Sequence, residues 1–519
     1  MSLRVGIAIA GAGVSGFATI GHLVEAFRPL TAAEVTLYWL QPPRKIQVEN
    51  LSASQRDRLT HLKNIGRDPT RLLGGGQVYH PVQPSLFTFN GDSAARGFNF
   101  AAGRYDTTDY FEWVQANREL LATLYPDFAP EKGQQRHPDH TLDDIKGTTP
   151  RGAYGLYLHD QVLALKGQLP NHITLQVIPE ALQRFEQNEQ TITIKTETRQ
   201  LIVDYLVQAT GPRFANRLPE WGNRVFNAYP CDGIALPSIA IPSIARPSEE
   251  RYAQNLTSQV TVVGAGAAGI EVALHLLHNL NVEHVTLVSH RAQSRLPQTA
   301  PTERYECQWF TRENMRLQPT AHNAQTLLKK ELETCYQACH LDYPGWDALL
   351  NIEDYPSFLE DYLTTTNLSP NHPLAHLVRP VMSFYGQVKD LLSTTEQLGV
   401  LQLIDRVKPL FATQSRPCAD LMLAAIKAQR LKLMAGEFLL DQTIPTILCS
   451  EGAQMHPNCI ILATGFESSI PPFYPQAKET RCYRVIGTSL SSVQKRAASV
   501  AEAIVSEASR KSAGRLIYR

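Results

Sequence analysis

Several sequence features are missing from this chain of 519 residues, and each absence excludes a class of protein. No apolar run reaches the roughly 20 residues that a helix needs to span a bilayer. Lys and Arg together number 49, as do Asp and Glu, and no long basic run predicts a nucleic-acid surface. The apolar start of the chain is short and interrupted by glycine, unlike a signal peptide. We therefore expect a soluble cytoplasmic protein whose partners include neither a membrane nor a nucleic acid.

Cysteine is sparse and irregularly placed, with eight residues and no C-x-x-C pair. This excludes a disulfide framework and a redox-active dithiol of the C-x-x-C kind. Cys335 and Cys339 lie one helical turn apart, with His340 beside them, but no second pair of ligands accompanies them. A structural metal site needs such a second pair, so we expect core cysteines and no metal.

Two glycine-rich turns are present, and each follows an apolar strand and opens a helix. The pattern is G-x-G-x-x-G, with glycines at Gly11, Gly13 and Gly16, and again at Gly264, Gly266 and Gly269. Such glycines let the backbone approach a pyrophosphate at the N-terminus of a helix. The two turns therefore predict two dinucleotide sites in one chain.

Each turn is also followed, far downstream, by an apolar strand that ends in Ala-Thr-Gly. The two segments are Ala209-Thr210-Gly211 and Ala463-Thr464-Gly465. We expect an α/β fold with two Rossmann-like dinucleotide-binding domains and a largely helical insertion, in which helices are clearest over 327–341 and 419–434. A chain that binds two dinucleotides usually moves a hydride between them, which predicts an oxidoreductase.

Neither unit carries the acidic residue that normally holds the ribose at the end of the second strand. In the first unit this position falls near Trp39, Leu40 and Gln41. Three explanations remain open: a residue from the following insertion substitutes, backbone and stacking contacts hold the adenosine, or the nucleotide site has decayed.

In the second unit the corresponding strand ends in Ser289-His290-Arg291. A 2′-phosphate is repelled by a carboxylate and bound by a hydroxyl and a guanidinium, so this pattern favours NADPH over NADH. Arg295 is a second candidate for the same role, and a solvated surface arginine is the alternative for Arg291. Glu271 directly follows the second turn, where a carboxylate is favoured by the helix dipole whatever its function.

The chain resembles flavin-dependent monooxygenases of the N-hydroxylating type, which have two dinucleotide-binding domains, FAD first and NADP second. Residues 264–271 are similar to the G-x-G-x-x-G-x-E of their nicotinamide domain. Residues 458–466, followed by Pro471-Pro472, are similar to their D-x3-[LF]-ATG-Y-x4-[HP]-P signature, with Asn458 and Phe466 in place of Asp and Tyr. The resemblance implies the following division: an FAD-binding domain over 1–228, a linker over 229–257, an NADP-binding domain over 258–299 and 441–470, a helical insertion over 300–440, and a return to the FAD domain over 471–519.

Three patches also resemble a bacterial FAD/NAD(P)-binding group, at residues 75–79, 98–104 with 111–113, and 151–158. By this resemblance the first glycine turn holds the FAD pyrophosphate. Asn99 and Arg104 lie near the flavin, and Gly465 closes against it. Each of these polar residues could equally be structural.

The resemblance implies that NADPH reduces the flavin and that a flavin C4a-hydroperoxide then transfers oxygen to a small nucleophilic substrate, such as an amine. The flavin carries this chemistry, so no catalytic acid or base is named. The alternatives are an NADPH dehydrogenase or reductase with another acceptor, and a non-catalytic flavoprotein sensor. The insertion over 300–440 supplies either the substrate pocket or the interface of a homo-oligomer.

Overall fold

The structure is a computed structural model of the whole chain. It describes residues 3–11, 13–87, 97–99, 104–107, 109–126, 149–211, 213–214, 219–229, 231–234, 259–297, 305–412, 414–440, 442–464, 466–467, 481–485 and 490–517. For 97–99, 104–107, 213–214, 219, 223, 259, 466–467, 490–492 and 511–517 it describes the backbone alone.

The first domain is built on a five-stranded parallel sheet with the strand order β19-β9-β1-β2-β5. These strands are β1 (Leu3–Ala10), β2 (Ala33–Leu40), β5 (Ile173–Ile178), β9 (Tyr205–Gln208) and β19 (Cys482–Arg484). Their apolar runs are buried on both faces, as parallel sheets require. One face packs on α1 (Val14–Phe27), α5 (Arg151–Gly167) and α15 (Leu490–Ile517).

The opposite face of this sheet is covered by a small antiparallel sheet. Its strands are β6 (Arg184–Gln187), β7 (Ile192–Lys195) and β8 (Gln200–Val203). Ile192 and Ile194 of β7 are fully buried against Ala8 and Ala10 of β1. Around the edge of the domain lie α2 (Ala53–Asn64), β3 (Gly97–Asn99), β4 (Arg104–Thr107), α3 (Asp109–Ala116) and α4 (Arg118–Leu124).

The second domain contains a seven-stranded sheet with the order β11-β17-β12-β13-β14-β15-β16. The first five strands are parallel: β11 (Val225–Asn227), β17 (Ile460–Leu462), β12 (Gln259–Val263), β13 (His284–Ser289) and β14 (Leu431–Leu439). The antiparallel β15 (Thr446–Cys449) and β16 (Gln454–Met455) extend one edge. Helices α7 (Ala267–His278) and α14 (Arg416–Lys427) pack beside it. Two parallel-sheet domains confirm the predicted fold class.

Between β13 and α14 the described residues form six inserted α-helices. They are α8 (Arg312–Leu317), α9 (Ala321–Ala338), α10 (Trp346–Leu350), α11 (Tyr355–Leu368), α12 (Pro373–Val388) and α13 (Thr394–Phe411). Their buried side chains and those of α7 and β12 form one continuous apolar core, so the insertion is part of the second domain's packing. The helix expected over 419–434 ends at Lys427, because residues from Leu431 onward pair in parallel with β13 as β14.

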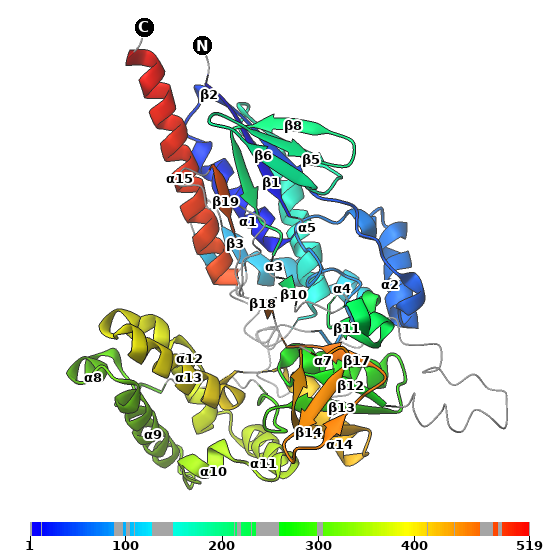
Figure 1. Ribbon diagram of the computed structural model, residues 1–519, viewed down its shortest axis with the longest axis vertical. Helices are drawn as coiled ribbons and strands as arrows, with labels where there is room; N and C mark the ends of the chain where they lie inside the picture. The colour runs from blue at the N-terminus through cyan, green and yellow to red at the C-terminus, as the bar shows by residue number, and fades with distance from the viewer. Residues whose placement is uncertain are drawn as a thin grey trace, which may run out of the picture.

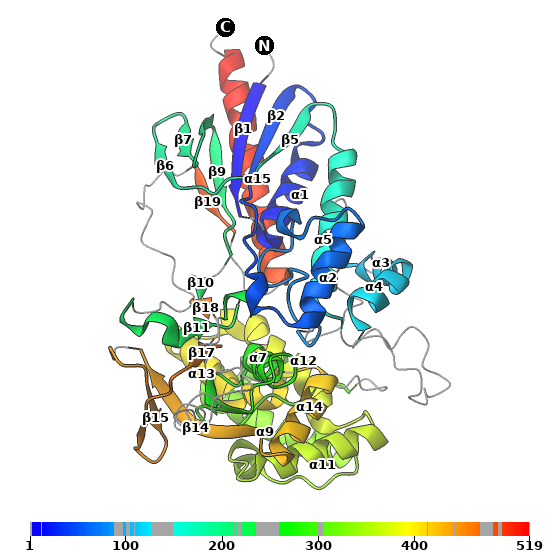
Figure 2. The same cartoon turned by 90° about the vertical axis from the view of Figure 1, so that its right-hand side faces the viewer.

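Within the described part of the chain, two short strands at the junction of the domains pair with each other. β10 (Arg213–Phe214) leaves the first domain and β18 (Phe466–Glu467) leaves the second, and they form an antiparallel pair. Figure 1 shows this pair between the upper domain, which contains both termini, and the lower domain with its helical insertion. Figure 2 shows the same division from the side, with α15 running along the first domain. Among the described residues, no helix is long and apolar enough to cross a bilayer.

Candidate dinucleotide-binding sites

The first glycine of each turn lies directly against the Ala-Thr-Gly segment of its own domain. Gly11 has φ +141°, and a Cβ atom there would lie 2.0 Å from the carbonyl oxygen of Ala209. Gly264 has φ +107°, and its Cβ atom would lie 2.6 Å from the carbonyl oxygen of Ala463. Both the backbone angle and the close approach require glycine. The pairing of each turn with an Ala-Thr-Gly segment is therefore a steric fit that the chain contains twice.

The third glycine of each turn lets the helix begin close under the turn. A Cβ atom on Gly16 would lie 2.2 Å from the carbonyl oxygen of Gly11, and one on Gly269 would lie 1.7 Å from that of Gly264. Any side chain here would push α1 or α7 away from its strand. These contacts are the helix–strand packing that the third glycine of the dinucleotide fingerprint provides.

The middle glycines, Gly13 and Gly266, are the N-cap residues of α1 and α7. Their backbone is extended, and glycine offers no side chain to cap the free N–H groups of the first turn. Neither first turn contains an acidic residue. Both helix N-termini are therefore suited to an external anion such as a pyrophosphate.

Two patches that the sequence singled out, 75–79 and 151–158, pack together beneath the first turn. A Cβ atom on Gly155 of α5 would lie 1.7 Å from the carbonyl oxygen of Tyr79. On the other side of this segment, a Cβ atom on Gly76 would lie 2.9 Å from the Cα atom of Gly13. The glycines of these patches thus bring the 75–79 segment against the pyrophosphate turn.

The position normally held by a ribose-binding carboxylate is occupied by Trp39 and Gln41. The Trp39 indole is fully buried and donates a hydrogen bond of 2.6 Å to the carbonyl oxygen of Gly11. Gln41 Nε2 donates to the Leu72 carbonyl oxygen at 2.9 Å, which fixes the orientation of the amide. Its Oε1 atom is buried and has no hydrogen-bond partner among the described residues. An unpaired buried acceptor next to the turn fits a ligand hydroxyl.

In the second domain the structure separates the two arginine candidates. Arg291 is exposed, and its Nη1 donates to the carbonyl oxygens of Arg406 at 3.1 Å and Leu350 at 3.5 Å in the helical insertion. Arg295 instead lies at the glycine turn, because a Cβ atom on Gly266 would lie 3.3 Å from its Nη2. Ser289 Oγ, at the end of β13, is bonded to the backbone of Gln293.

The Arg295 guanidinium places a positive charge beside this helix N-terminus. Burial lowers the pKa of Arg295. The negative charge of Glu271 raises this pKa, whereas the positive charge of Arg151 lowers it. Its side chain has no hydrogen-bond acceptor among the residues that the structure describes. A partly buried guanidinium with no acceptor in the described ranges, next to an uncapped helix N-terminus, fits a phosphate group.

Glu271, one turn into α7, is paired with a residue of the first domain. Its carboxylate is 3.0 Å from Arg151 at the start of α5, and it accepts a 3.0 Å hydrogen bond from the Tyr229 hydroxyl. Arg151 also contacts the Tyr229 oxygen. Burial opposes the charged form of Arg151, but the neighbouring Glu271 and Tyr229 raise the pKa of Arg151 above its ordinary value. The Arg151 guanidinium therefore stays charged beside Glu271, whose side chain is only 2% exposed.

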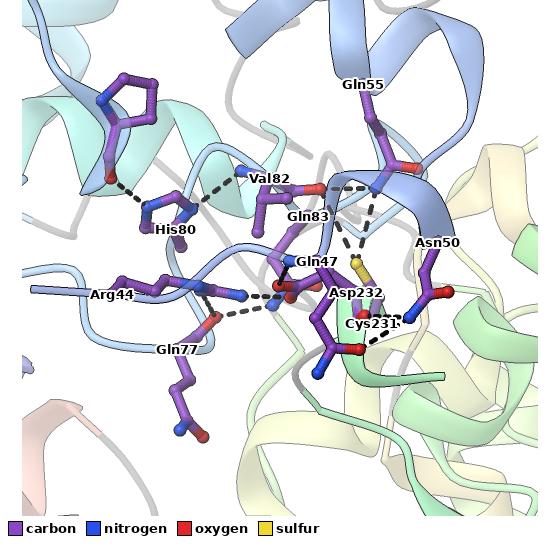
Figure 3. Close-up of polar contacts among 11 residues, drawn as sticks. Arg44, Gln47, Asn50, Gln55, Gln77, His80, Val82, Gln83, Cys231 and Asp232 are labelled. Carbon is purple, nitrogen blue, oxygen red and sulfur yellow. Dashed lines mark hydrogen bonds and ion pairs between the residues drawn. The ribbon is translucent and has the colours of Figure 1, made fainter. Parts of the chain in front are cut away.

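A second arginine–carboxylate pair joins the domains at Asp232, and Figure 3 shows its surroundings. Arg44 points at the Asp232 carboxylate, which also accepts a 3.3 Å hydrogen bond from the backbone N–H of Gln47. Asn50 donates to the Asp232 carbonyl oxygen at 2.8 Å. Asp232 is buried, and Gln55 donates to the neighbouring Cys231 Sγ at 3.5 Å. Sequence reasoning missed Arg44 and Asp232 and included Arg151 only within the 151–158 patch, because no motif marks a contact between such distant segments.

The remaining sequence candidates divide by what the structure describes. Asn99 and Arg104 face each other in the β3–β4 hairpin, where the backbone alone is described. Gly211 has φ +78° and no atom within 4 Å of its Cβ position, and Gly465 lies outside the described residues. Burial raises the pKa of the Cys335 thiol, as expected for a core cysteine. No cluster of metal-binding side chains occurs within the described ranges.

Comparison with known protein families finds one match, in the first domain. Residues 8–213 match the family model described as FAD-NAD(P)-binding, so this part of the chain is similar to that family. No curated protein matches the sequence. The match confirms the predicted FAD/NAD(P) cofactors, and with a second dinucleotide fold in the same chain it confirms the oxidoreductase class.

Several solved structures are similar to the chain over nearly its whole length, at low identity. The ornithine hydroxylase PvdA from Pseudomonas aeruginosa is 12% identical, with 97% of this chain and 99% of that one covered, at a TM-score of 0.42. The ornithine N-hydroxylase KtzI from Kutzneria sp. 744 is 11% identical, with 98% and 100% covered, at 0.44. The L-lysine 6-monooxygenase from Pseudomonas syringae is 13% identical, with 97% and 99% covered, at 0.40.

Proposed function

We propose that this chain is an FAD-dependent monooxygenase that takes a hydride from NADPH and oxidises a small nucleophilic substrate, with an amine as the favoured class. The observation that supports it most directly is the pair of glycine turns, which are built by the same contacts in both domains. We call each turn, together with the helix N-terminus that it opens, a cradle. One cradle lies within the FAD-NAD(P)-binding match, and the other lies in a domain joined to it by buried ion pairs. Two dinucleotides held by one chain is the arrangement that hydride transfer between them needs.

FAD is assigned to the first cradle. Gly13 leaves room for the pyrophosphate at the N-terminus of α1, and Gln41 Oε1 offers an acceptor for a ribose hydroxyl. Asn99, Arg104 and Gly465 are assigned to the surroundings of the flavin through the family patches. When bound, the flavin supplies hydride acceptance and oxygen activation, while the protein positions the substrate and excludes water.

NADPH is assigned to the second cradle, with separate roles for the two arginines. Arg295 lies against Gly266 and therefore near the pyrophosphate. Arg291, beside Ser289 at the end of β13, is assigned to the 2′-phosphate. Arginine suits both sites, since its guanidinium can donate two hydrogen bonds to a phosphate.

The monooxygenase and amine assignments are supported by the signature-like segment from Asn458 to Phe466. Its strand β17 and the following Ala463 build the wall against which the second glycine turn packs. We further assign the substrate pocket or a subunit interface to the insertion, residues 300–440.

Oxygen use distinguishes the proposed monooxygenase from a dehydrogenase. The purified protein is expected to show flavin absorbance that NADPH bleaches under anaerobic conditions. After air is admitted with a panel of primary amines, one amine should give a hydroxylated product in proportion to the NADPH consumed, with little hydrogen peroxide. Reoxidation by ferricyanide, with only peroxide formed in air for every amine, would instead identify a dehydrogenase. A protein without flavin absorbance even after incubation with FAD would contradict the proposal.

A further inference from the structure

Both buried arginine–carboxylate pairs described above cross from one domain to the other. Arg44 and Arg151 come from the first domain, whereas Asp232 and Glu271 lie in the segment after β11 and on α7 of the second. The carboxylate side chains are each 2% exposed. By contrast, the carboxylates of the Arg4–Glu34 and Arg312–Asp390 pairs are exposed, and an ion pair at the surface contributes little to stability.

A third, apolar contact adjoins the Arg151–Glu271 pair. Phe87, from the first domain, is fully buried in the second domain's core, with its ring 5.5 Å from that of Tyr229. The carbonyl oxygen of the preceding Leu86 accepts a 3.4 Å hydrogen bond from Cys418 Sγ on α14. Two ion pairs and one buried ring thus join the domains, and the ring lies beside the Arg151–Glu271 pair.

Separating such pairs is costly, since it leaves a buried charge without its partner. Rotation of one domain against the other would break at least one pair and withdraw Phe87 from the core. Arg151 also contacts α7, the helix that the second glycine turn opens. The contact is made to Glu271, two residues after Gly269.

We propose that Arg44 and Arg151 are positioning residues that fix the placement of the NADPH cradle relative to the FAD cradle, so that flavin reduction proceeds without domain rotation. This inference rests on the proposed function. Hydride transfer depends steeply on distance, and a misplacement of about 1 Å can cost roughly a hundredfold in rate. Arg151 acts here through Glu271 and α7, without needing to touch either dinucleotide.

Kinetics test the positioning role, because a positioning residue should change the rate of flavin reduction but not the affinity for NADPH. In Arg151→Met, FAD content and the dissociation constant for NADPH should change little, whereas the limiting rate of anaerobic flavin reduction should fall about tenfold or more. Arg151→Lys, which keeps the charge, should recover part of the rate. The matched control is Arg67→Met, which removes a 3.0 Å ion pair with Asp160 inside the first domain and should reduce at the wild-type rate.

Small-angle X-ray scattering tests the domain placement without any turnover. The wild-type profile should be the same with and without NADPH, and the Arg44→Met/Arg151→Met double variant should differ from it. A wild-type profile that changes with NADPH would overturn the inference, as would wild-type reduction rates in Arg151→Met. If NADPH binds but never reduces the wild-type flavin, the proposed function fails, and the scattering comparison still decides the placement.

Discussion

Arg295 lies against Gly266, with its Nη2 atom 3.3 Å from the place where a Cβ atom of that glycine would be. The guanidinium therefore faces the N-cap of α7, whereas Arg291 reaches away to carbonyl oxygens of the insertion. The two arginines, four positions apart in the sequence, are expected to contact different parts of the same cofactor.

Substitution of the two arginines should separate these roles. Arg295→Met should weaken NADPH and NADH binding alike, because both carry the pyrophosphate. Arg291→Ala should weaken NADPH alone, since NADH lacks the 2′-phosphate. Each lost contact is expected to cost about 1.5–3 kcal/mol of binding free energy. Equilibrium binding of both cofactors to both variants measures this, and an equal loss of NADPH and NADH in Arg291→Ala would contradict the assignment.

Gly13 provides a test of the FAD cradle that leaves the fold intact. Its backbone is extended, and the protein atom nearest to an added Cβ atom is Gly76 Cα at 3.7 Å. A methyl group therefore fits the protein but occupies the space needed for the pyrophosphate. We expect Gly13→Ala to lower FAD content and Gly13→Val to abolish it, as read from the flavin absorbance of the purified protein.

Gly167→Ala is the matched control, because no atom lies within 4 Å of its Cβ position. It should retain full flavin content. Full flavin content in Gly13→Val as well would show that this turn does not bind the pyrophosphate.

The sequence was enough to predict the two glycine turns, but it did not predict the contacts around them. The glycine spacing and the Ala-Thr-Gly segments predicted both cradles, because such close backbone approaches exclude every residue but glycine. The pairing of Glu271 with Arg151 was not predictable, since it depends on how two domains pack. The helix expected over 419–434 was too long because Leu431 and Leu433 also suit a strand, and only the neighbouring β13 decides between the two.

His80 should make the stability of the first domain depend on pH. Burial lowers the pKa of His80 to about 3, and the charge of Arg44 acts in the same direction. In the unfolded chain the His80 imidazole has a pKa near 6.5, so below that pH the unfolded state binds a proton that the folded state does not. The stability that His80 contributes is therefore present at neutral pH and lost as the pH falls from about 6.5 towards 3. Between pH 7 and pH 5 the loss should be about 2 kcal/mol.

Urea unfolding of the wild type and of His80→Asn at these two pH values measures this contribution. The variant lacks the titrating ring, so its free energy of unfolding should fall less between pH 7 and pH 5. The other buried histidines, His275 and His372, remain in both proteins and cancel in the comparison. Equal pH dependence in the two proteins would show that His80 does not titrate as expected.

The helical insertion should be required for the second domain's stability but not for FAD binding. Phe384 on α12 is buried and stacks on Phe310, with ring centroids 3.6 Å apart. Phe384→Ala should destabilise the second domain by about 3–5 kcal/mol while the protein remains yellow. Leu368→Ala, at a side chain that is 86% exposed, is the control and should behave as the wild type. Loss of flavin in Phe384→Ala would show that the first domain depends on this core.

The order of strands in the first sheet has a consequence for synthesis on the ribosome. β1, β2 and β9 emerge early, but the edge strand β19 and the covering helix α15 come from residues after the whole second domain. The second domain, from β11 to β17, is therefore fully synthesised while the first domain still lacks its edge strand β19 and its helix α15. Because domains fold as units during translation, the nascent first domain exposes apolar residues of α1 until the last helix leaves the exit tunnel. During this interval the exposed apolar residues of α1 are open to aggregation or to binding by a chaperone.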